Sequence, residues 1–183
     1  MDVCVFGQSF VRKLEPKLGN SVKTENGEGK IHFVFRSGGT ATNLMSMVDQ
    51  IPADVRVVFM QIGDNDIHPH QQAFQTATII MNLVRRVSLQ CPGALIFVGS
   101  IFPRFKPQGM SREVYNRKRV IINTIIADQV RQLAQVRCWD NCRKVRCNLR
   151  NYAEDRVHLN EAGNSLFAKT VMMALKIGLR RLQ

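Results

Sequence analysis

The sequence has no long hydrophobic run. Its longest apolar stretches, such as residues 57–60 and 94–98, are only a few residues long. A membrane-spanning helix needs roughly 18 or more apolar residues, so no spanning segment is expected. The chain opens with Asp2 where an export signal would carry a basic residue, and we expect no export signal there.

Acidic residues are also scarce. The chain carries 14 Asp and Glu against 26 Lys and Arg, a formal net charge of +12. The excess lies mostly in residues 131–183, with 11 basic and 4 acidic side chains. This asymmetry favours partners with phosphate or other anionic groups, so we keep RNA and an anionic membrane surface as candidates. It is equally typical of ordinary solvated helix faces.

Cysteine occurs five times, and an odd count argues against a disulfide framework. It favours a reducing compartment, and we expect a cytoplasmic protein. Cys138, Cys142 and Cys147 lie close together in sequence, but their spacing lacks the paired C-x2-C of structural zinc sites and no His lies between them. We therefore expect ordinary thiols, no metal and no cofactor.

The remaining pattern predicts one α/β domain over residues 1–183, since 45% of the residues are hydrophobic and 22% are charged. Apolar, β-branched or aromatic runs predict strands at residues 3–6, 31–35, 55–62 and 94–100, with a weaker fifth at 136–139. Apolar positions at i, i+3 and i+4 predict helices at residues 10–18, 42–51, 71–90, 112–135 and 160–182. Residues 20–30 are polar and predict a connection. Strands alternating with helices are typical of a parallel sheet covered by helices on both faces.

In such folds the ligand binds beyond the carboxyl ends of the strands. Ser9 follows the first strand, where it is either a nucleophile or a helix cap. Gly38 follows the second strand, in a glycine pair that leaves backbone N–H groups open before the candidate cap Thr40. Asn65 follows the third, where its amide is either an oxyanion donor or a turn residue.

An acid and a histidine lie close together near the C-terminus. Asp155 precedes His158 by three residues, a spacing that lets the carboxylate accept from one imidazole nitrogen. The other nitrogen is then free to act as a general base. Isolated Asp-x-x-His pairs also arise by chance, so this pair alone decides nothing.

In this order, the motifs Gly-x-Ser, Ser-Gly-x-Thr, Gly-x-Asn-Asp and Asp-x-x-His resemble the blocks of the SGNH (GDSL-type) hydrolase family. The resemblance implies a three-layer, flavodoxin-like α/β/α sandwich with a five-stranded parallel sheet. It implies a serine esterase acting on acetyl or lipid esters, with Ser9 as nucleophile, His158 as general base and Asp155 as its orienting acid. The implied oxyanion hole consists of the Ser9 N–H, the Gly38 N–H and the Asn65 side chain.

One position departs from the family pattern. Gln8 stands where the family usually has Asp, immediately before the serine. An acid at this position supports the loop and is not one of the three catalytic residues Ser9, His158 and Asp155. We therefore expect a lower esterase activity or a narrower range of substrates, and not a complete loss of activity. The alternative is a weak or inactive scaffold that serves as an RNA- or membrane-associated module.

A finer likeness rests on Arg-Ser-Gly-Gly-Thr, Ser-Ile-Phe-Pro-Arg, Tyr-Asn-x-x-Arg and Val-His-Leu-Asn-Glu-Ala-Gly. These resemble the esterase domains of animal retrotransposon proteins, including the first open-reading-frame products of LINE-type elements. That likeness implies a place in an intracellular ribonucleoprotein particle. In the segment 101–110, Phe102, Phe105 and Met110 predict core packing beneath the loop, with a mobile lid as the alternative.

Overall fold

The computed structural model describes residues 1–25 and 27–181. In chain order its helices and strands are β1 (Val3–Gly7), α1 (Ser9–Leu18), β2 (Ser21–Thr24), β3 (Gly27–Phe35), α2 (Ala41–Met45), η1 (Val48–Gln50), β4 (Val57–Gln61), α3 (Ala73–Gln90), β5 (Leu95–Gly99), α4 (Arg112–Val130), β6 (Val136–Trp139), α5 (Asn141–Val145), η2 (Leu149–Asn151) and α6 (Glu161–Arg181). All five predicted strands and all five predicted helical segments are present, which confirms the α/β class.

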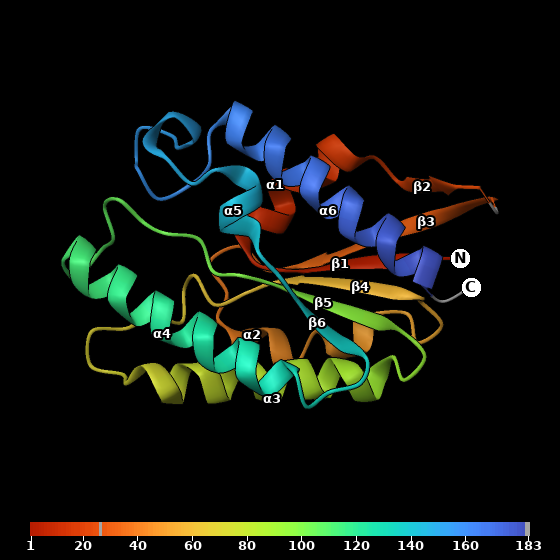
Figure 1. The fold of residues 1–183 in the computed structure, drawn as a ribbon, viewed down its shortest axis with the longest axis horizontal. Helices are drawn as coiled ribbons and strands as arrows, with labels where there is room; N and C mark the ends of the chain where they lie inside the picture. The colour runs from red at the N-terminus through yellow and green to blue at the C-terminus, as the bar shows by residue number, and fades with distance from the viewer. Residues whose placement is uncertain (26, 182–183) are drawn as a thin grey trace.

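The strands form one sheet in the order β2-β3-β1-β4-β5-β6. Strands β3, β1, β4, β5 and β6 pair in parallel. Helices α1, α5 and α6 cover one face, and α2, α3 and α4 cover the other (Figure 1). The predicted α/β/α sandwich with five parallel strands is therefore confirmed.

The sheet has a sixth strand that the sequence did not predict. Residues 20–30 were expected to form a polar connection, but β2 and the first half of β3 form an antiparallel pair there. Within this stretch of described residues only Val22 and Gly29 are buried, so the apolar pattern of a strand is missing. Polar and charged side chains are typical of edge strands, where they discourage pairing with other chains.

Each face of the sheet carries its own hydrophobic core. Along β1, Cys4 and Phe6 face the core under α2, α3 and α4, whereas Val3 and Val5 face the core under α1 and α6. Side chains alternate between the faces of a strand, so a strand covered on both sides becomes apolar throughout. Phe102 is fully buried in the second core and Phe105 packs against it, which confirms core packing for these residues.

Two of the predicted helices differ from the observed ones in their extent. The predicted helix at 42–51 divides into α2 and η1, because the chain turns at Ser46 and Met47. The predicted helix at 112–135 ends at Val130, and residue 182 of the last predicted helix lies outside the described residues. Within the described part of the chain, no helix has the length and hydropathy to cross a bilayer.

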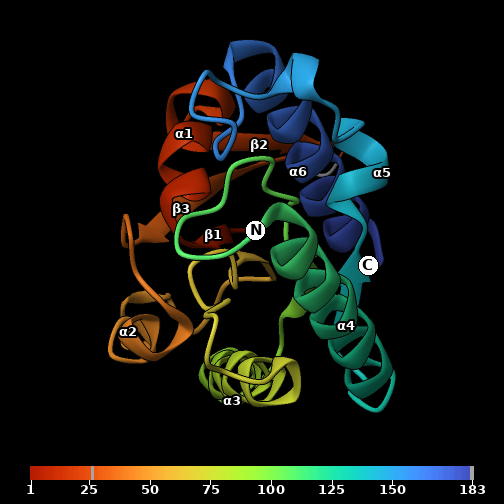
Figure 2. The same ribbon diagram turned by 90° about the vertical axis from the view of Figure 1, so that its left-hand side faces the viewer.

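The carboxyl ends of the parallel strands meet at one edge, which faces the viewer in Figure 2. Strand β1 lies between β3 and β4: the chain adds β3 on one side of β1 and then crosses to add β4 on the other, so the strand order reverses here. Such a reversal opens a crevice between the loops that follow the strands. The side chains on these loops are therefore the first candidates for a site.

Candidate active site

A cavity of about 570 Å³ lies at this edge of the sheet. All five site residues predicted from the sequence line it: Ser9, Gly38, Asn65, Asp155 and His158. They come from four segments that are far apart in the sequence and follow β1, β3, β4 and η2, with Ser9 at the start of α1. Arg12, Ser37, Arg104, Lys106, Pro107, Gln108 and Val157 complete the lining.

Ser9 is the first residue of α1, and Gln8 occupies the N-cap position with extended backbone. Ser9 is therefore not the helix cap, which answers the alternative raised by the sequence. Gly7 brings the turn close to β4, since a Cβ atom there would lie 2.1 Å from the carbonyl oxygen of Gln61. This close approach sets Ser9 at the rim of the cavity, half-buried at the positive end of the helix dipole.

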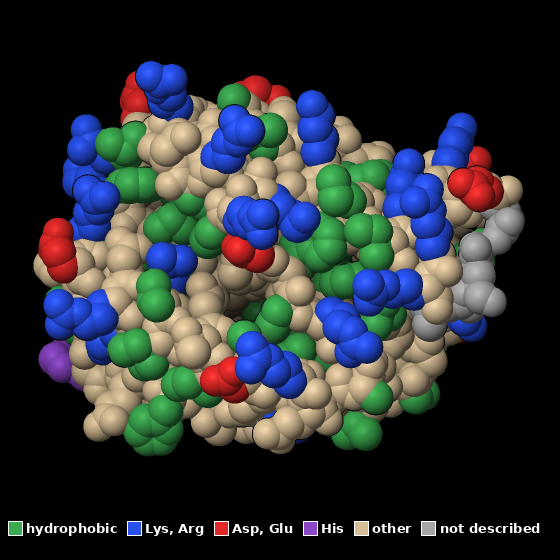
Figure 3. Space-filling model, viewed as in Figure 1, with side chains coloured by type: hydrophobic (Ala, Val, Ile, Leu, Met, Phe, Trp, Pro, Cys, Tyr) green, Lys and Arg blue, Asp and Glu red, His purple; other side chains and the backbone are tan. Residues whose placement is uncertain are grey.

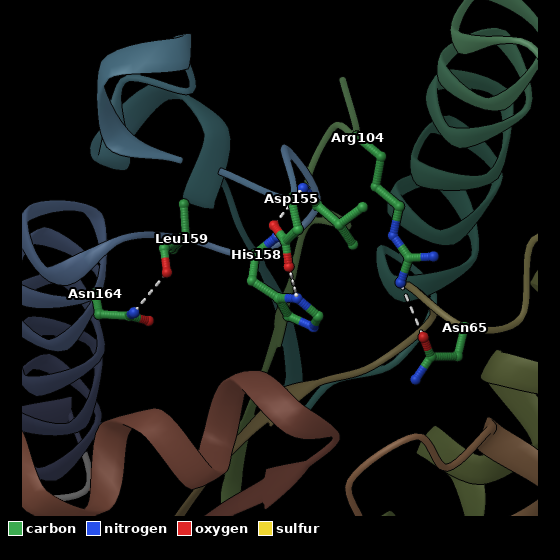
Figure 4. Close-up of polar contacts among 7 residues, drawn as sticks. Asn65, Arg104, Asp155, His158, Leu159 and Asn164 are labelled. Atoms are coloured by element: carbon green, nitrogen blue, oxygen red, sulfur yellow. Dashed lines mark hydrogen bonds and ion pairs between the residues drawn. The ribbon is translucent and has the colours of Figure 1, made fainter. Parts of the chain in front are cut away.

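Asp155 and His158 form a direct pair. Oδ2 of Asp155 lies 2.7 Å from Nδ1 of His158 (Figure 4). Its other oxygen, Oδ1, accepts from the backbone N–H groups of Val157 and His158 at 2.9 and 3.0 Å. The carboxylate therefore holds both the imidazole and the turn that carries it.

The Asp155 carboxylate is stabilised in its charged form. Burial opposes ionisation, but the hydrogen bonds from the His158 ring and from the two N–H groups outweigh it and lower the pKa of Asp155 to about 2. At neutral pH Asp155 is thus an acceptor, and Nδ1 of His158 carries the hydrogen between them. Nε2 is then the nitrogen left to take a proton.

The histidine turn is anchored on both sides. The Ala153 N–H donates to the His158 carbonyl at 2.8 Å, and the Asn164 amide of α6 donates to the Leu159 carbonyl at 2.8 Å. The ring of Phe10, next to Ser9, lies 5.9 Å from the His158 ring between centroids. The hydroxyl of Ser9 and the imidazole thus line one cavity, although no hydrogen bond joins them in the part of the chain described.

The turn after β3 presents open N–H groups to the cavity, and one of them belongs to Gly38. Gly38 has φ +70°, a conformation that favours glycine, and it is exposed at the cavity. The N–H of Gly39 already donates to the Arg36 carbonyl at 3.1 Å, whereas that of Gly38 has no acceptor among the described residues. Of the two glycines, Gly38 is therefore the one whose N–H is free to donate to a ligand, and its place in the oxyanion hole stays a prediction.

Asn65 is fixed in orientation by two neighbours. Its Nδ2 donates to the Gly39 carbonyl at 3.1 Å, and its Oδ1 accepts from Nη2 of Arg104 at 2.8 Å. Because the amide has two hydrogens, one stays available for the cavity. Figure 4 shows the Arg104–Asn65 pair across from the Asp155–His158 pair.

Sequence reasoning gave Arg104 no role, although its motif Ser-Ile-Phe-Pro-Arg directly follows a predicted strand. Residues at the start of α4 hold its loop: Nδ2 of Asn116 donates to the Arg104 carbonyl at 2.8 Å, and Nη1 of Arg119 donates to the Ile101 carbonyl at 3.3 Å. These belong to the Tyr-Asn-x-x-Arg motif, whose Tyr115 hydroxyl donates to the Asp64 carbonyl at 3.3 Å. The motif thus braces two of the loops that form the site.

Gln8 links three loops beneath the site. Its Nε2 donates to the Gly39 carbonyl at 2.6 Å and to Oδ2 of Asp66 at 3.1 Å, and its Oε1 accepts from the Asp64 N–H at 3.2 Å. The side chain is completely buried. An amide can both donate and accept here, so Gln8 supports the loop geometry in place of the carboxylate usual at this position.

This arrangement can be compared with known proteins. The sequence model of the GDSL-like Lipase/Acylhydrolase family matches residues 8–166. The chain belongs to that family. As a GDSL-like member it is an ester hydrolase, and its matched segment contains every candidate site residue.

Solved structures of GDSL-like and other esterases share this fold. A GDSL-like lipase from Bacteroides thetaiotaomicron superposes with a TM-score of 0.72 at 16% identity, over 96% of this chain and 88% of that one. A lipase from a goat rumen metagenome gives 0.73 at 14% identity, with both chains fully covered. A serine-to-alanine variant of an acetyl esterase, solved with acetate, gives 0.73 at 16% identity with the same coverage. No curated protein sequence matches the chain.

Proposed function

We propose that this GDSL-like hydrolase cleaves acyl esters through an acyl-enzyme on Ser9. In the first step, Nε2 of His158 takes the hydroxyl proton of Ser9 while the oxygen attacks the ester carbonyl. The imidazolium that forms is stabilised by Asp155 through Nδ1. It then gives the proton to the leaving alcohol, which departs and leaves the acyl group on Ser9.

The second half of the reaction mirrors the first. Water loses a proton to Nε2 of His158 and attacks the acyl carbonyl, and the imidazolium returns that proton to the Ser9 oxygen. In both halves the carbonyl oxygen becomes negative. We assign its stabilisation to the Ser9 N–H, the Gly38 N–H and the free hydrogen of the Asn65 amide.

The observation that carries this proposal is the 2.7 Å contact between Asp155 and His158 at the rim of the Ser9 cavity. A carboxylate of lowered pKa fixes the tautomer that a general base requires. The family adds support, and so does the acetate present in the structure of a related acetyl esterase. Retention of the whole arrangement is the reason to propose an active enzyme and not an inactive scaffold.

Ser9→Ala tests the nucleophile. We expect the variant to lose hydrolysis of p-nitrophenyl acetate and to lose covalent labelling by a fluorophosphonate, since only an activated serine reacts with that probe. Ser46→Ala, at the exposed end of α2, is a matched control with no part in the site. Equal turnover or equal labelling by Ser9→Ala and the parent, with both folded by circular dichroism, would reject the assignment.

We further propose a retrotransposon-encoded origin and an intracellular place in a ribonucleoprotein particle. The motifs that resemble the esterase domains of animal retrotransposon proteins, such as Arg-Ser-Gly-Gly-Thr and Val-His-Leu-Asn-Glu-Ala-Gly, support the origin. The five free cysteines support a reducing compartment. Lys and Arg side chains are spread over much of the face in Figure 3, with few acidic ones between them. Arg143, Lys144 and Arg146 on and after α5 are exposed, which supports contact with RNA phosphates.

The RNA contact has its own test. The triple variant Arg143→Gln, Lys144→Gln and Arg146→Gln should bind single-stranded RNA more weakly than the parent, with a smaller dependence of log Kd on log salt. Esterase activity is the internal control, because these three residues lie outside the cavity. Binding that ignores ionic strength would count against RNA, and flotation with anionic vesicles in place of RNA binding would favour a membrane surface.

A further inference from the structure

Two cysteines line a second cavity, of about 750 Å³, beside α4 and the segment after β5. They are Cys142 and Cys147, and both are partly exposed. Cys142 also lines a neighbouring cavity of about 450 Å³, where Figure 3 shows a hollow between α4 and α5. Neither thiol takes part in the proposed esterase mechanism, yet both are open to small molecules.

The backbone holds these two cysteines side by side. Helix α5 ends at Arg146 in the left-handed conformation, with φ 52° and ψ 71°. The N–H groups of Arg146 and Cys147 both turn back to the Cys142 carbonyl, the latter at 3.3 Å. Helix ends of this kind bring the side chains at these two positions toward each other, and both thiols line the same cavity. Adjacent sulfurs are the first requirement for a disulfide.

The two thiols differ in reactivity. Nη1 of Arg119 lies 3.5 Å from Sγ of Cys142, and the Ser100 hydroxyl lies 3.7 Å from it. The influence of the neighbouring Cys147 thiol and the Arg119 charge outweigh burial and lower the pKa of Cys142 to about 7. The neighbouring Cys142 and burial raise the pKa of Cys147. A thiolate is the reactive form of cysteine, so Cys142 is the sulfur prepared for attack.

We propose that Cys142 and Cys147 are an oxidisable pair, which a hydroperoxide converts to an intramolecular disulfide and a small thiol converts back. Cys142 is the attacking sulfur and Cys147 the resolving one. The assignment does not depend on the esterase function, since it concerns a different cavity.

The chemistry balances with hydrogen peroxide as oxidant. The Cys142 thiolate attacks one peroxide oxygen, so that an S–O bond forms, the O–O bond breaks and hydroxide leaves to be protonated by solvent. The Cys147 sulfur then attacks the Cys142 sulfenic acid. An S–S bond forms, the S–O bond breaks, and the oxygen leaves as water with the proton of Cys147. The two sulfurs are oxidised, and one peroxide is reduced to two waters.

The pair touches the loop that carries Arg104. Sγ of Cys142 donates to the Ile101 carbonyl at 3.5 Å. Cys147 packs against the core that contains Tyr152, and the Tyr152 hydroxyl donates to the Pro103 carbonyl at 2.8 Å. Oxidation would therefore change contacts immediately behind the esterase site, although peptide mapping detects the disulfide without any esterase readout.

Peptide mapping of the full-length chain tests the pair. Trypsin cleaves after Arg137, Arg143, Arg146 and Arg150, so a disulfide would join the peptides 138–143 and 147–150. Because the first peptide also contains Cys138, the experiment uses Cys138→Ser protein, treated with hydrogen peroxide, blocked with N-ethylmaleimide and digested without reductant. We expect the joined peptide in that protein and its loss after dithiothreitol.

Two further variants make the result decisive. Cys142→Ser should give no joined peptide, and Cys147→Ser should accumulate a sulfenic acid on Cys142 that dimedone traps. Cys4 and Cys91, both buried, are internal controls that should react at least about tenfold more slowly with N-ethylmaleimide than Cys142. Absence of the joined peptide from folded Cys138→Ser protein would overturn the proposal, as would oxidation confined to Cys138 in the parent.

Discussion

The side-chain amide of Gln8 donates to Oδ2 of Asp66 at 3.1 Å in a completely buried position. Oδ1 of Asp66 accepts from the Ala41 N–H at 2.8 Å, at the start of α2. The two residues thus tie the turn after β1 to the loop after β4 and to the first turn of a helix on the opposite side of the site. Gln8 stands where the family usually has an acid, and in this chain the amide of Gln8 is paired with the acid Asp66.

Gln8→Asp should therefore destabilise the protein, although it introduces the residue usual in the family. The new carboxylate would face that of Asp66 and would leave Oδ2 of Asp66 without its donor, at a cost of about 1–3 kcal/mol. Urea denaturation measures the change in the free energy of unfolding. The double variant Gln8→Asp with Asp66→Asn should recover most of the loss, because one amide and one acid are restored to the pair. Equal stability of the single variant and the parent would contradict this account.

Arg104 is proposed to act through Asn65 and not on the substrate directly. Asn65→Ala should lower kcat by about 10²–10³ with little change in KM, as expected for one oxyanion donor. Arg104→Lys keeps the charge but loses the fixed geometry of the guanidinium, and should lower kcat by roughly tenfold.

A double-mutant cycle separates this positioning role from a general loss of structure. In the Asn65→Ala background, Arg104→Lys should have almost no further effect on kcat, since the group it orients is gone. Asn82→Ala, exposed on α3, is the matched control for an asparagine outside the site. Independent, multiplicative effects of the two substitutions would show that Arg104 does not act through Asn65.

Asp155→Asn should reduce kcat by up to about 10⁴-fold, the effect of the same change in a well-studied serine hydrolase triad. The amide oxygen can still accept from the Val157 and His158 N–H groups, so the turn should keep its shape. What changes is the partner of Nδ1, which no longer favours the tautomer that leaves Nε2 free. Steady-state kinetics on p-nitrophenyl acetate provides the measurement, and unchanged kcat would remove Asp155 from the mechanism.

Asp64 should make the folded state less stable as the pH rises. Burial raises its pKa from 3.8 to about 6, even though the Arg104 charge acts in the opposite direction. Between these values the folded chain holds a proton that the unfolded chain has lost, so this group's contribution to stability declines as the pH rises from about 4 to 6.

Asp64→Asn removes that titration. Relative to the parent, the variant should gain stability between pH 4 and 7, by up to about 3 kcal/mol. The free energy of unfolding in urea, measured at several pH values for both proteins, provides the comparison. Parallel curves for the two proteins would show that Asp64 does not titrate in this range.

Local sequence pattern was sufficient for most of the fold. The strands at the centre of the sheet are apolar throughout because both faces are covered, and such runs are recognisable without any structure. The edge strand β2 was missed because its residues face solvent and lack that pattern. The short helix α5 was missed for a related reason: with only Asn141 and Val145 buried, it has no apolar stripe.

The sequence by itself was sufficient to propose the chemistry of the site, because the motifs that contain Ser9, Gly38, Asn65, Asp155 and His158 follow one another in the order typical of one family. Tertiary structure decided how those groups are held. The donors and acceptors of Gln8, Arg104 and Asn65 come from loops up to 58 residues apart, and no local pattern encodes such pairings. Cys142 and Cys147 were expected to be ordinary thiols, because the sequence did not predict α5 or its left-handed end. The difference between the two thiols depends on Arg119, which only the packing of α4 beside α5 brings close. Local propensity acts over a few residues, whereas a hydrogen bond between distant loops exists only after the sheet has aligned them.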